Sequence, residues 1–507
     1  MAQRFFAKLS PSFGLVAALC VSSMAFAAAP SERPVVPRFE SASCAFKEDR
    51  DWAAKNGVSC GWVTVKAHRD KSDSATLRLW VVKVAANGAA TGVRTPLIRI
   101  WYGPTAANIT ATALKTSQFI PLLRPARDVI FFDYRGMGRS EPNTTCTVAR
   151  AGGATIAIRL RSILAQHKKC RRQIEARSTD LSAINAAAAA QDVRDIAKAM
   201  GYLTYDIWGA SYGSFPALDL IRQRPSGLRA AIIGVAVPPD STTLEQLSTF
   251  NQGLTAMQRE CDRDAQCHAR FPHMTASLGR AMERLDRERL MGRSRRLTPL
   301  DLNNAIFGMG ALAAEPELVP LAIDTAEKGN AALVAKWIDA AKGDDFPQMT
   351  DPDAAAQITL VCNSFASRHP IKADVEAAGR RYPYLIRATR PTDGLDRICN
   401  VWKIPAPPRD MFKHAKSDIP VLFYSARFDM AVDNSDTVRA AKLLPHSTIV
   451  EVPSAGHSFS DDCLIHLEAA FLVNPSGVLD RSCTAEMKPI KFAVDRFEAY
   501  VATLAAH

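Results

Sequence analysis

One stretch of the sequence decides the fold: Tyr205-Asp206-Ile207-Trp208-Gly209-Ala210-Ser211-Tyr212-Gly213. Residues 205–208 are typical of a buried strand, and a G-x-S-x-G string follows them directly before a helical stretch. A serine on a sharp strand-to-helix turn needs glycine on both sides, because larger side chains there would collide. Such a string occurs by chance in about one chain in ten of this composition, and Ser211 is then an ordinary turn serine. Its position between a strand and a helix favours a nucleophilic serine instead.

The segments around this turn predict an α/β protein with a mostly parallel sheet. Alternation over 44–84 is typical of early antiparallel strands, and short apolar strands that alternate with helices are typical of parallel ones. The later strands are expected at 96–101, 128–132, 205–208, 230–235, 420–424 and 447–452, with a helix at 185–200.

Between about residues 242 and 403 the sequence is mostly helical, which predicts a helical cap inserted into the sheet domain. The expected helices of this block lie at 245–262, 276–290, 299–308, 317–329 and 331–341. The predicted divisions are a first part of the α/β core at 28–240, the cap at 241–405 and a second part of the core at 406–507. The last of these ends in a segment that we expect a disulfide to link.

A serine hydroxyl needs a base to attack a carbonyl, and the base needs a group that orients it. In folds with this kind of turn the chain order is Ser, then Asp or Glu, then His. Asp429 follows the strand expected at 420–424, and His457 lies in the loop after the strand that ends at 452. Both residues therefore follow the carboxyl ends of strands, where α/β sheets build their sites. Asp433 and Asp436 are alternatives for the acid that could instead cap a helix, and we favour Asp429.

Acyl transfer also places negative charge on the carbonyl oxygen, which needs N–H donors. One donor is expected to be the backbone N–H of Tyr212, directly after the nucleophile. The second is expected at Gly103, in the turn after the strand at 96–101, although a plain β-turn would explain that glycine equally well.

The first 27 residues have the three parts of a secretory signal peptide. Arg4 and Lys8 form the positive region, residues 13–26 the apolar region, and Ala25-Phe26-Ala27 the cleavage site. A membrane anchor would need a longer apolar stretch, and a lipoprotein would need a small residue before Cys20. We expect export by the general secretory route to the periplasm or the medium, with cleavage near Ala27.

Export changes the interpretation of the eleven cysteines, because Cys20 would leave with the signal peptide and ten would remain. In an oxidising compartment five disulfides account for them. The sequence does not fix which cysteines pair, and neighbour pairing is the simplest arrangement. That arrangement joins Cys44 to Cys60, Cys146 to Cys170, Cys261 to Cys267, Cys362 to Cys399, and Cys463 to Cys483.

The formal net charge of +12 comes from basic residues that are scattered among acidic ones. Nucleic-acid binding would need a basic stripe or a recognisable module, and no apolar run is long enough for a membrane helix. We therefore expect a small peptide or ester as the partner, and neither nucleic acid nor a membrane. The sequence has no H-E-x-x-H, P-loop or G-x-G-x-x-G motif, so no metal or organic cofactor is expected.

Taken together, several motifs give the chain a resemblance to a known family. They are Gly209-Ala210-Ser211-Tyr212-Gly213, Asp133-Tyr134-Arg135-Gly136-Met137-Gly138-Arg139-Ser140, the loops of Asp429 and Gly456-His457, the cap cysteines Cys261 and Cys267, and the tail from Cys463 through Asn474-Pro475 to Cys483. With them the chain resembles the α/β-hydrolase superfamily and, within it, the proline iminopeptidase family, especially its tripeptidyl aminopeptidase-like branch.

The resemblance implies an α/β-hydrolase fold and a serine exopeptidase that removes short amino-terminal pieces from peptides. It implies the triad Ser211, Asp429 and His457, with Gly103 and Tyr212 as oxyanion donors. In place of the family's Gly-Gly-Pro-Gly turn this chain has Tyr102-Gly103-Pro104-Thr105, a departure that concerns substrate scope. Acidic cap residues bind the substrate's free amine in the family, and the sequence does not select among Glu245, Glu260, Glu283, Glu315 and Glu317.

Because the same machinery hydrolyses amides and esters, a carboxylesterase that acts on small esters is the alternative function. A binding protein built on a hydrolase scaffold is a second alternative, which an intact Ser, Asp and His make less favoured.

Overall fold

Strand and helix positions come from a computed structural model of the chain. It describes residues 35–44, 46, 49–88, 95–100, 103, 109, 114–115, 117, 119–146, 156–241, 245–292, 296–312, 315–340, 354–366, 376–377, 379–386, 394–458 and 460–506. Residues 36–507 form one unit, to which the following description applies. The expected signal peptide lies outside the described residues.

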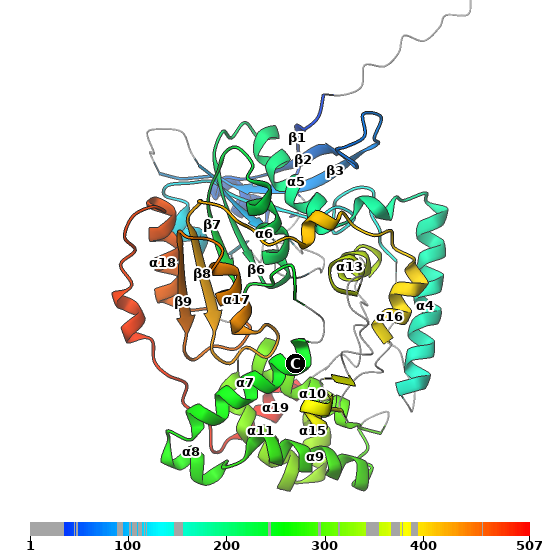
Figure 1. Ribbon diagram of the computed structural model, residues 1–507, viewed down its shortest axis with the longest axis vertical. Helices are drawn as coiled ribbons and strands as arrows, with labels where there is room; N and C mark the ends of the chain where they lie inside the picture. The colour runs from blue at the N-terminus through cyan, green and yellow to red at the C-terminus, as the bar shows by residue number, and fades with distance from the viewer. Residues whose placement is uncertain are drawn as a thin grey trace, which may run out of the picture. The chain divides into compact units, whose positions relative to one another are not determined.

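In the described residues nine strands form a single sheet in the order β1-β2-β3-β5-β4-β6-β7-β8-β9 (Figure 1). β1 to β3 and the β3–β5 pair are antiparallel, and all remaining neighbours are parallel. The strands span Arg38–Ala42 (β1), Val58–Lys66 (β2), Thr76–Val84 (β3), Leu97–Ile100 (β4), Val129–Phe132 (β5), Tyr205–Ala210 (β6), Leu228–Gly234 (β7), Val421–Ala426 (β8) and Ser447–Val452 (β9). The central strands are buried throughout, as expected for parallel strands covered by helices on both faces.

Helices cover both faces of the sheet. One hydrophobic cluster joins the sheet to α5 (Ala186–Ala199), α6 (Ser214–Gln223) and α17 (Asn434–Ala441). The cluster on the other face joins it to α1 (Arg50–Lys55), α3 (Phe119–Leu123) and α18 (Asp462–Val473). The first turn of α5 is fixed by Asn185, whose side chain accepts a hydrogen bond from the backbone N–H of Ala188 at 2.9 Å.

The segment between β7 and β8 is helical, and we call it the helical insertion. A hydrophobic cluster of its own packs together α7 (Glu245–Cys261), α8 (Ala265–Arg270), α9 (Met274–Glu288), α10 (Pro299–Phe307), the π-helical turn η3 (Gly308–Leu312), α11 (Val319–Lys328), α12 (Ala331–Ala340) and α15 (Pro383–Ile386). Buried residues of the C-terminal helix α19 (Phe497–Ala506) belong to the same cluster. Figure 1 shows these helices together below the sheet.

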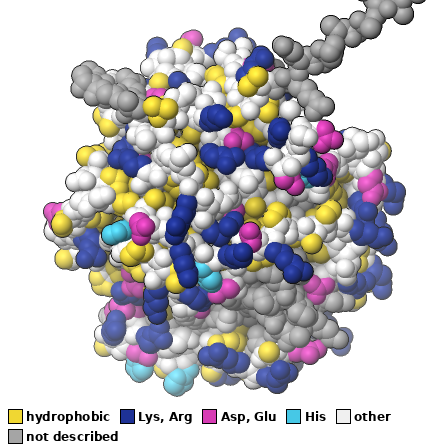
Figure 2. Space-filling view, turned by 45° about the horizontal axis from the view of Figure 1, so that its top comes forward, with side chains coloured by type: hydrophobic (Ala, Val, Ile, Leu, Met, Phe, Trp, Pro, Cys, Tyr) yellow, Lys and Arg dark blue, Asp and Glu magenta, His cyan; other side chains and the backbone are white. Residues whose placement is uncertain are grey.

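A further cluster joins α4 (Ile156–Ala176) to α13 (Ala354–Val361) and α16 (Gly394–Trp402). Lys and Arg side chains are spread across the face shown in Figure 2, with Asp and Glu among them. Among the described residues, no helix has the length and apolar character needed to cross a bilayer.

The predicted fold class is confirmed, and the expected later strands and insertion helices are present within a few residues of their expected ends. The boundaries of core and cap remain a prediction. All five neighbouring cysteine pairs form disulfides, with Cα–Cα distances from 5.1 to 5.7 Å. Such a set suits a protein outside the reducing cytoplasm.

Candidate active site

Ser211 stands at the turn between β6 and α6, where the sequence predicts it. Its φ of +52° lies in the left-handed region, which non-glycine residues adopt rarely and mostly where the surrounding structure enforces it. A Cβ added at Gly209 would lie 2.6 Å from the carbonyl oxygen of Gly213, so the turn can close only with glycine there. The hydroxyl of Ser214 donates to the carbonyl of Ser211 at 2.5 Å and ties the turn to α6.

Asp429 and His457 come from the loops after β8 and β9, two neighbouring parallel strands. Asp429 Oδ1 accepts hydrogen bonds from the backbone N–H groups of Ala431 at 2.7 Å and Val432 at 2.9 Å. These bonds leave the second carboxylate oxygen, Oδ2, directed to the histidine. The two loops are also joined by a bond from the N–H of Phe428 to the carbonyl of Ala455, at 2.9 Å.

The three side chains form one hydrogen-bonded relay. His457 Nδ1 lies 2.8 Å from Asp429 Oδ2, and His457 Nε2 lies 3.0 Å from Ser211 Oγ. A carboxylate can only accept, so Nδ1 carries the proton and donates it to Asp429. Nε2 is then free to accept the hydrogen bond of the Ser211 hydroxyl. This is the geometry that a general base needs toward a nucleophile.

The electrostatic surroundings make His457 a stronger base. Burial of the ring lowers its pKa, but the charge of Asp429 and the hydrogen bond to it outweigh burial, so that the pKa of His457 is raised above 6.5. The Asp429 side chain is fully buried and the His457 side chain is 12% exposed, so water screens their interaction little.

The two alternative acids have other partners. Asp433 caps α17, where its Oδ1 accepts from the N–H of Ser435 at 2.7 Å. Asp436 accepts from the hydroxyl of Ser241 at 2.8 Å and pairs with Arg439. The structure therefore brings Asp429, and neither alternative, to His457.

Both expected oxyanion donors, Tyr212 and Gly103, are described residues, but the residues next to Gly103 are not. Tyr212 is buried directly after Ser211, and its hydroxyl bonds to that of Ser364 at 3.1 Å. Burial raises the pKa of Tyr212 above 10, so this hydroxyl stays protonated. Gly103 is a half-buried residue in a bend, while residues 101–102 and 104–108 lie outside the described residues. Its role as the second donor remains a prediction.

The helical insertion contacts both the Asp429 loop and the His457 loop. The N–H of Ser458 donates to the carbonyl of Ala311 in η3 at 2.8 Å. A Cβ added at Gly456 would lie 2.0 Å from the carbonyl oxygen of Gly310, so the His457 loop and η3 meet backbone to backbone. Met430, next to Asp429, belongs to the hydrophobic cluster of the insertion. The position of the triad therefore depends on the insertion as well as on the sheet.

Two acidic residues follow η3 and were among the candidates that the sequence could not separate. Glu315 bonds through its N–H to the carbonyl of Met309 at 3.2 Å, and Glu317 lies two residues further on. Burial and the negative charge of Glu315 raise the pKa of Glu317. In the described residues neither carboxylate has a Lys, Arg or His as an ion-pair partner, and Glu315 Oε2 is buried without any hydrogen-bond partner.

The other three candidates differ. Glu260 is neutralised by Arg263 and Arg427. Glu283 is exposed on α9, and the side chain of Glu245 lies outside the described residues. Their place after η3 and the lack of a cationic partner in the described residues thus leave Glu315 and Glu317 as the candidates for acids that could bind an amine. The sequence contains no local signal for this choice.

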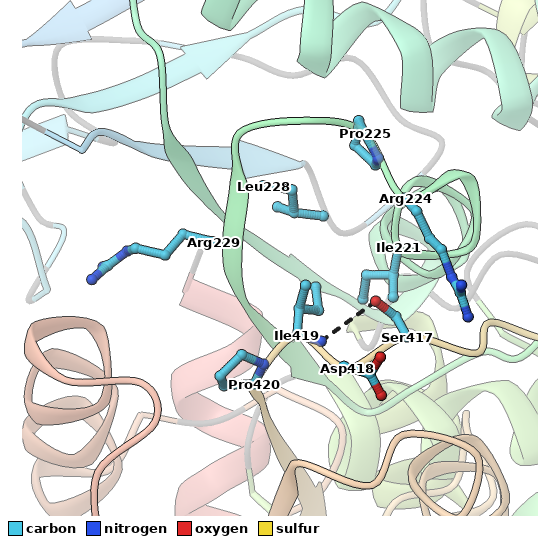
Figure 3. Close-up of a pocket in the computed structure, with 9 residues that line it drawn as sticks. All are labelled: Ile221, Arg224, Pro225, Leu228, Arg229, Ser417, Asp418, Ile419 and Pro420. Atoms are coloured by element: carbon cyan, nitrogen blue, oxygen red, sulfur yellow. Dashed lines mark hydrogen bonds between the residues drawn. The ribbon is translucent and has the colours of Figure 1, made fainter.

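A separate hollow of about 390 Å³ lies at the opposite ends of the strands (Figure 3). Leu228 at the start of β7 and Pro420 just before β8 line it, whereas Ser211 follows the carboxyl end of β6. In Figure 3 Arg229 extends away from the hollow, and it pairs with Asp206. This hollow is therefore not part of the triad site. Within the described ranges no group of three or more His, Cys, Asp or Glu side chains could hold a metal ion.

A family model described as alpha/beta hydrolase fold matches residues 111–462, which is more than half of the chain. The chain belongs to this family of hydrolases. Comparison with curated protein sequences gives no match.

Solved structures similar to this chain include three bacterial hydrolase-fold proteins. An alpha/beta hydrolase fold protein from Chitinophaga pinensis is 14% identical, with 87% of this chain and 98% of that chain covered and a TM-score of 0.35. A serine hydrolase from Cycloclasticus zankles is 13% identical, with 82% and 99% covered and a TM-score of 0.37. An esterase from Exiguobacterium antarcticum is 12% identical, with 80% and 97% covered and a TM-score of 0.33. The assignment to the family rests on the sequence match and the sheet topology.

Proposed function

We propose that the protein is an exported serine hydrolase that releases short amino-terminal pieces from peptides. Ser211 Oγ attacks the scissile carbonyl carbon while His457 Nε2 takes the hydroxyl proton. The tetrahedral intermediate then collapses, the C–N bond breaks, and His457 gives its proton to the leaving amine. Water then attacks the acyl-serine with His457 again as base, the bond between the acyl carbon and Ser211 Oγ breaks, the amino-terminal piece leaves as a carboxylic acid, and the proton returns from His457 to Ser211 Oγ.

Asp429 holds the imidazole in the tautomer that leaves Nε2 free to accept, and its charge stabilises the imidazolium that forms in each half-reaction. The 2.8 Å and 3.0 Å contacts of the relay support these roles. The backbone N–H groups of Tyr212 and Gly103 are proposed to bind the oxyanion.

The acidic pair Glu315 and Glu317 carries the choice of an aminopeptidase over an esterase. A free peptide amino terminus is a cation at neutral pH, whereas a small ester has no group that needs a carboxylate partner. Two neighbouring carboxylates without a described cationic partner favour binding of such a cation. They follow the η3 turn whose backbone meets the His457 loop, and this short separation along the chain supports a place for them beside the substrate.

The test compares three substrates of matched sequence: a peptide anilide with a free amino terminus, its N-acetylated twin and an acyl ester. The proposal predicts that acetylation lowers kcat/KM at least tenfold. Glu315→Gln and Glu317→Gln should each raise KM for the free-amine substrate about tenfold to a hundredfold, since hydrogen bonds to charged groups contribute about 1.5–3 kcal/mol. Glu288→Gln, which removes an acid that pairs with Arg284 on α9, is the matched control.

Three other outcomes contradict the proposal. Turnover of the ester alone would establish a carboxylesterase. Equal rates with the free and the acetylated peptide would remove the role of the acidic pair. No turnover together with no reaction with a fluorophosphonate probe would indicate a non-catalytic binding protein.

We also propose that residues 1–27 direct export and are removed near Ala27, to the periplasm or the medium. The five disulfides support a compartment outside the cytoplasm. Amino-terminal sequencing of the protein purified from its native host tests this, and an intact Met1 would contradict it.

A further inference from the structure

The side chain of Tyr212, directly after the nucleophile, is held at its far end. Its ring is buried in the hydrophobic cluster that joins the sheet to α5, α6 and α17, with its centroid 6.4 Å from that of Phe215. Its hydroxyl forms a hydrogen bond with the Ser364 hydroxyl at 3.1 Å. Both residues are buried, so water does not readily replace this bond when one partner is removed.

Ser364 lies in the π-helical turn η5 (Cys362–Ala366), which directly follows α13. Single π-helical turns are rare and occur frequently at functional sites. The two residues before Ser364 are both fixed. The side-chain amide of Asn363 donates to the carbonyl of Ile184 at 3.1 Å, and a disulfide joins Cys362 to Cys399 of α16. The Ser364 hydroxyl is therefore held on a support that cannot easily shift.

Helix α13 carries η5 to this position by packing on two sides. Ala356 and Leu360, one helical turn apart, belong to the same hydrophobic cluster as Tyr212. Ala355 and Ile358 belong to the cluster with α4 and α16, which Figure 1 shows beside α13. The helix is thus fixed between two clusters, and η5 continues from it to Tyr212.

The serine turn needs support of this kind. Ser211 has a φ of +52°, and a non-glycine residue keeps such a backbone only where the surrounding structure enforces it. On the side of β7, the N–H of Val237 donates to Ser214 Oγ at 2.7 Å, and that hydroxyl donates to the Ser211 carbonyl. On the side of α13, Ser364 holds the tip of Tyr212. Support from both sides fixes the orientation of the peptide that contains the Tyr212 N–H.

We infer that Ser364 is a positioning residue whose bond to the Tyr212 hydroxyl keeps the Tyr212 N–H directed at the oxyanion. The inference rests on the acyl-transfer step of the proposed function, and it applies to a peptide and an ester alike. Oxyanion donors lower the barrier because they are oriented before the reaction begins. A looser turn should therefore slow the chemical step and leave binding of the substrate ground state unchanged.

Two variants remove the bond from opposite ends. Ser364→Ala removes one hydroxyl, and Tyr212→Phe removes the other while the Tyr212 backbone N–H stays in place. We expect each to lower kcat about tenfold with KM within about twofold, for the peptide anilide and for the ester. This is less than the hundredfold or more that loss of a whole oxyanion donor costs. Thr359→Val is the matched control, because the buried Thr359 hydroxyl donates to the carbonyl of Ala355 within α13; both constants should stay within about twofold.

An inhibitor separates positioning of the oxyanion donor from a general structural effect. In a trifluoromethyl ketone analogue of the anilide, Ser211 Oγ adds to the ketone carbon, its proton passes to His457, and the ketone oxygen becomes an oxyanion. Its Ki should rise in both variants by the factor by which kcat/KM falls. The Ki of the carboxylic acid product, which binds without this addition, should not change. Equal weakening of the ketone and the product would overturn the inference.

A double-mutant cycle tests whether Ser364 acts through Tyr212. The variant with both changes should be no slower than either single variant, whereas a hundredfold loss of kcat would overturn the inference. Thermal melts establish that each variant is folded, and Tyr212→Phe alone tests the inference if Ser364→Ala does not fold. An active wild type with unchanged kcat and ketone Ki in both variants would overturn this inference alone. A wild type with neither turnover nor fluorophosphonate labelling would overturn the proposed function, and this inference with it.

Discussion

Glu468 is a buried acid whose protonation links the stability of the protein to pH. It lies on α18 against the sheet, and its Oε1 accepts a hydrogen bond from Trp208 Nε1 at 2.9 Å. Arg99 stacks over the Trp208 ring, with its guanidinium carbon 3.4 Å from the ring centroid. Burial raises the pKa of Glu468 from its ordinary value of 4.5 to about 7, although the Trp208 bond and the Arg99 charge act in the opposite direction. The native protein therefore favours the protonated form of this acid.

Between pH 4.5 and 7 the native state binds more protons at this site than the unfolded state. The contribution of Glu468 to stability is thus fully present below pH 4.5 and is lost as the pH rises through 7. At 1.36 kcal/mol per pH unit, the loss above pH 7 amounts to about 3 kcal/mol. Glu468→Gln keeps an acceptor for the indole N–H but never becomes charged. At pH 8 it should raise the free energy of unfolding by up to about 3 kcal/mol, and at pH 4.5 by almost nothing.

Urea unfolding followed by tryptophan fluorescence at pH 4.5, 6 and 8, with the disulfides intact, measures this difference. Glu451→Gln, on β9 and paired with Arg427, is the exposed control and should change stability by less than about 1 kcal/mol at any pH. A Glu468→Gln variant that is less stable than the wild type at pH 8, or equally altered at all three values, would refute the reasoning.

Further predictions concern the relay and one buried histidine. Asp429→Asn should lower kcat about 10⁴-fold with little change in KM, because the amide favours the wrong tautomer of His457; steady-state kinetics measure both constants. Gly456→Ala forces a Cβ to within 2.0 Å of the Gly310 carbonyl oxygen, so kcat should fall about a hundredfold while a thermal melt shows a folded protein. Unchanged kcat would show that η3 does not position the loop. Burial lowers the pKa of His167 to about 4, so the free energy of unfolding should fall by about 3 kcal/mol as the pH drops from 6.5 through 4. His167→Asn should remove most of this fall, and urea unfolding at several pH values measures the difference.

The sequence predicts the sheet, the serine turn and the relay because their signals are local. The apolar run at 205–208 and the glycines at 209 and 213 report a strand and a tight turn directly. Asp429 and His457 follow from chain order and from the rule that sites form at the carboxyl ends of strands. The sequence does not fix the disulfide pairing, but its simplest arrangement, between neighbouring cysteines, is the one present at all five pairs.

Features that depend on packing between distant segments are not predictable in this way. Nothing near Glu317 in the sequence indicates that the C-terminal segment lies beside it, since the hydrogen bond from the Ala493 N–H to the Glu317 carbonyl exists only after that segment packs into the insertion. The selection of Glu315 and Glu317 over Glu260 depends on Arg427, which the β8 loop brings to Glu260. Helix α4 is different, because apolar residues at 160, 163, 164 and 174 recur with helical spacing and could have predicted it.

We expect the contact of His457 Nε2 with Ser211 Oγ to make this one serine hydroxyl a nucleophile. Labelling with a fluorophosphonate probe, followed by peptide mass mapping, tests it most directly. We expect one label per chain, on Ser211, with loss of labelling in Ser211→Ala and a labelling rate at least a hundredfold lower in His457→Ala. Labelling of another serine, or an undiminished rate in His457→Ala, would contradict it.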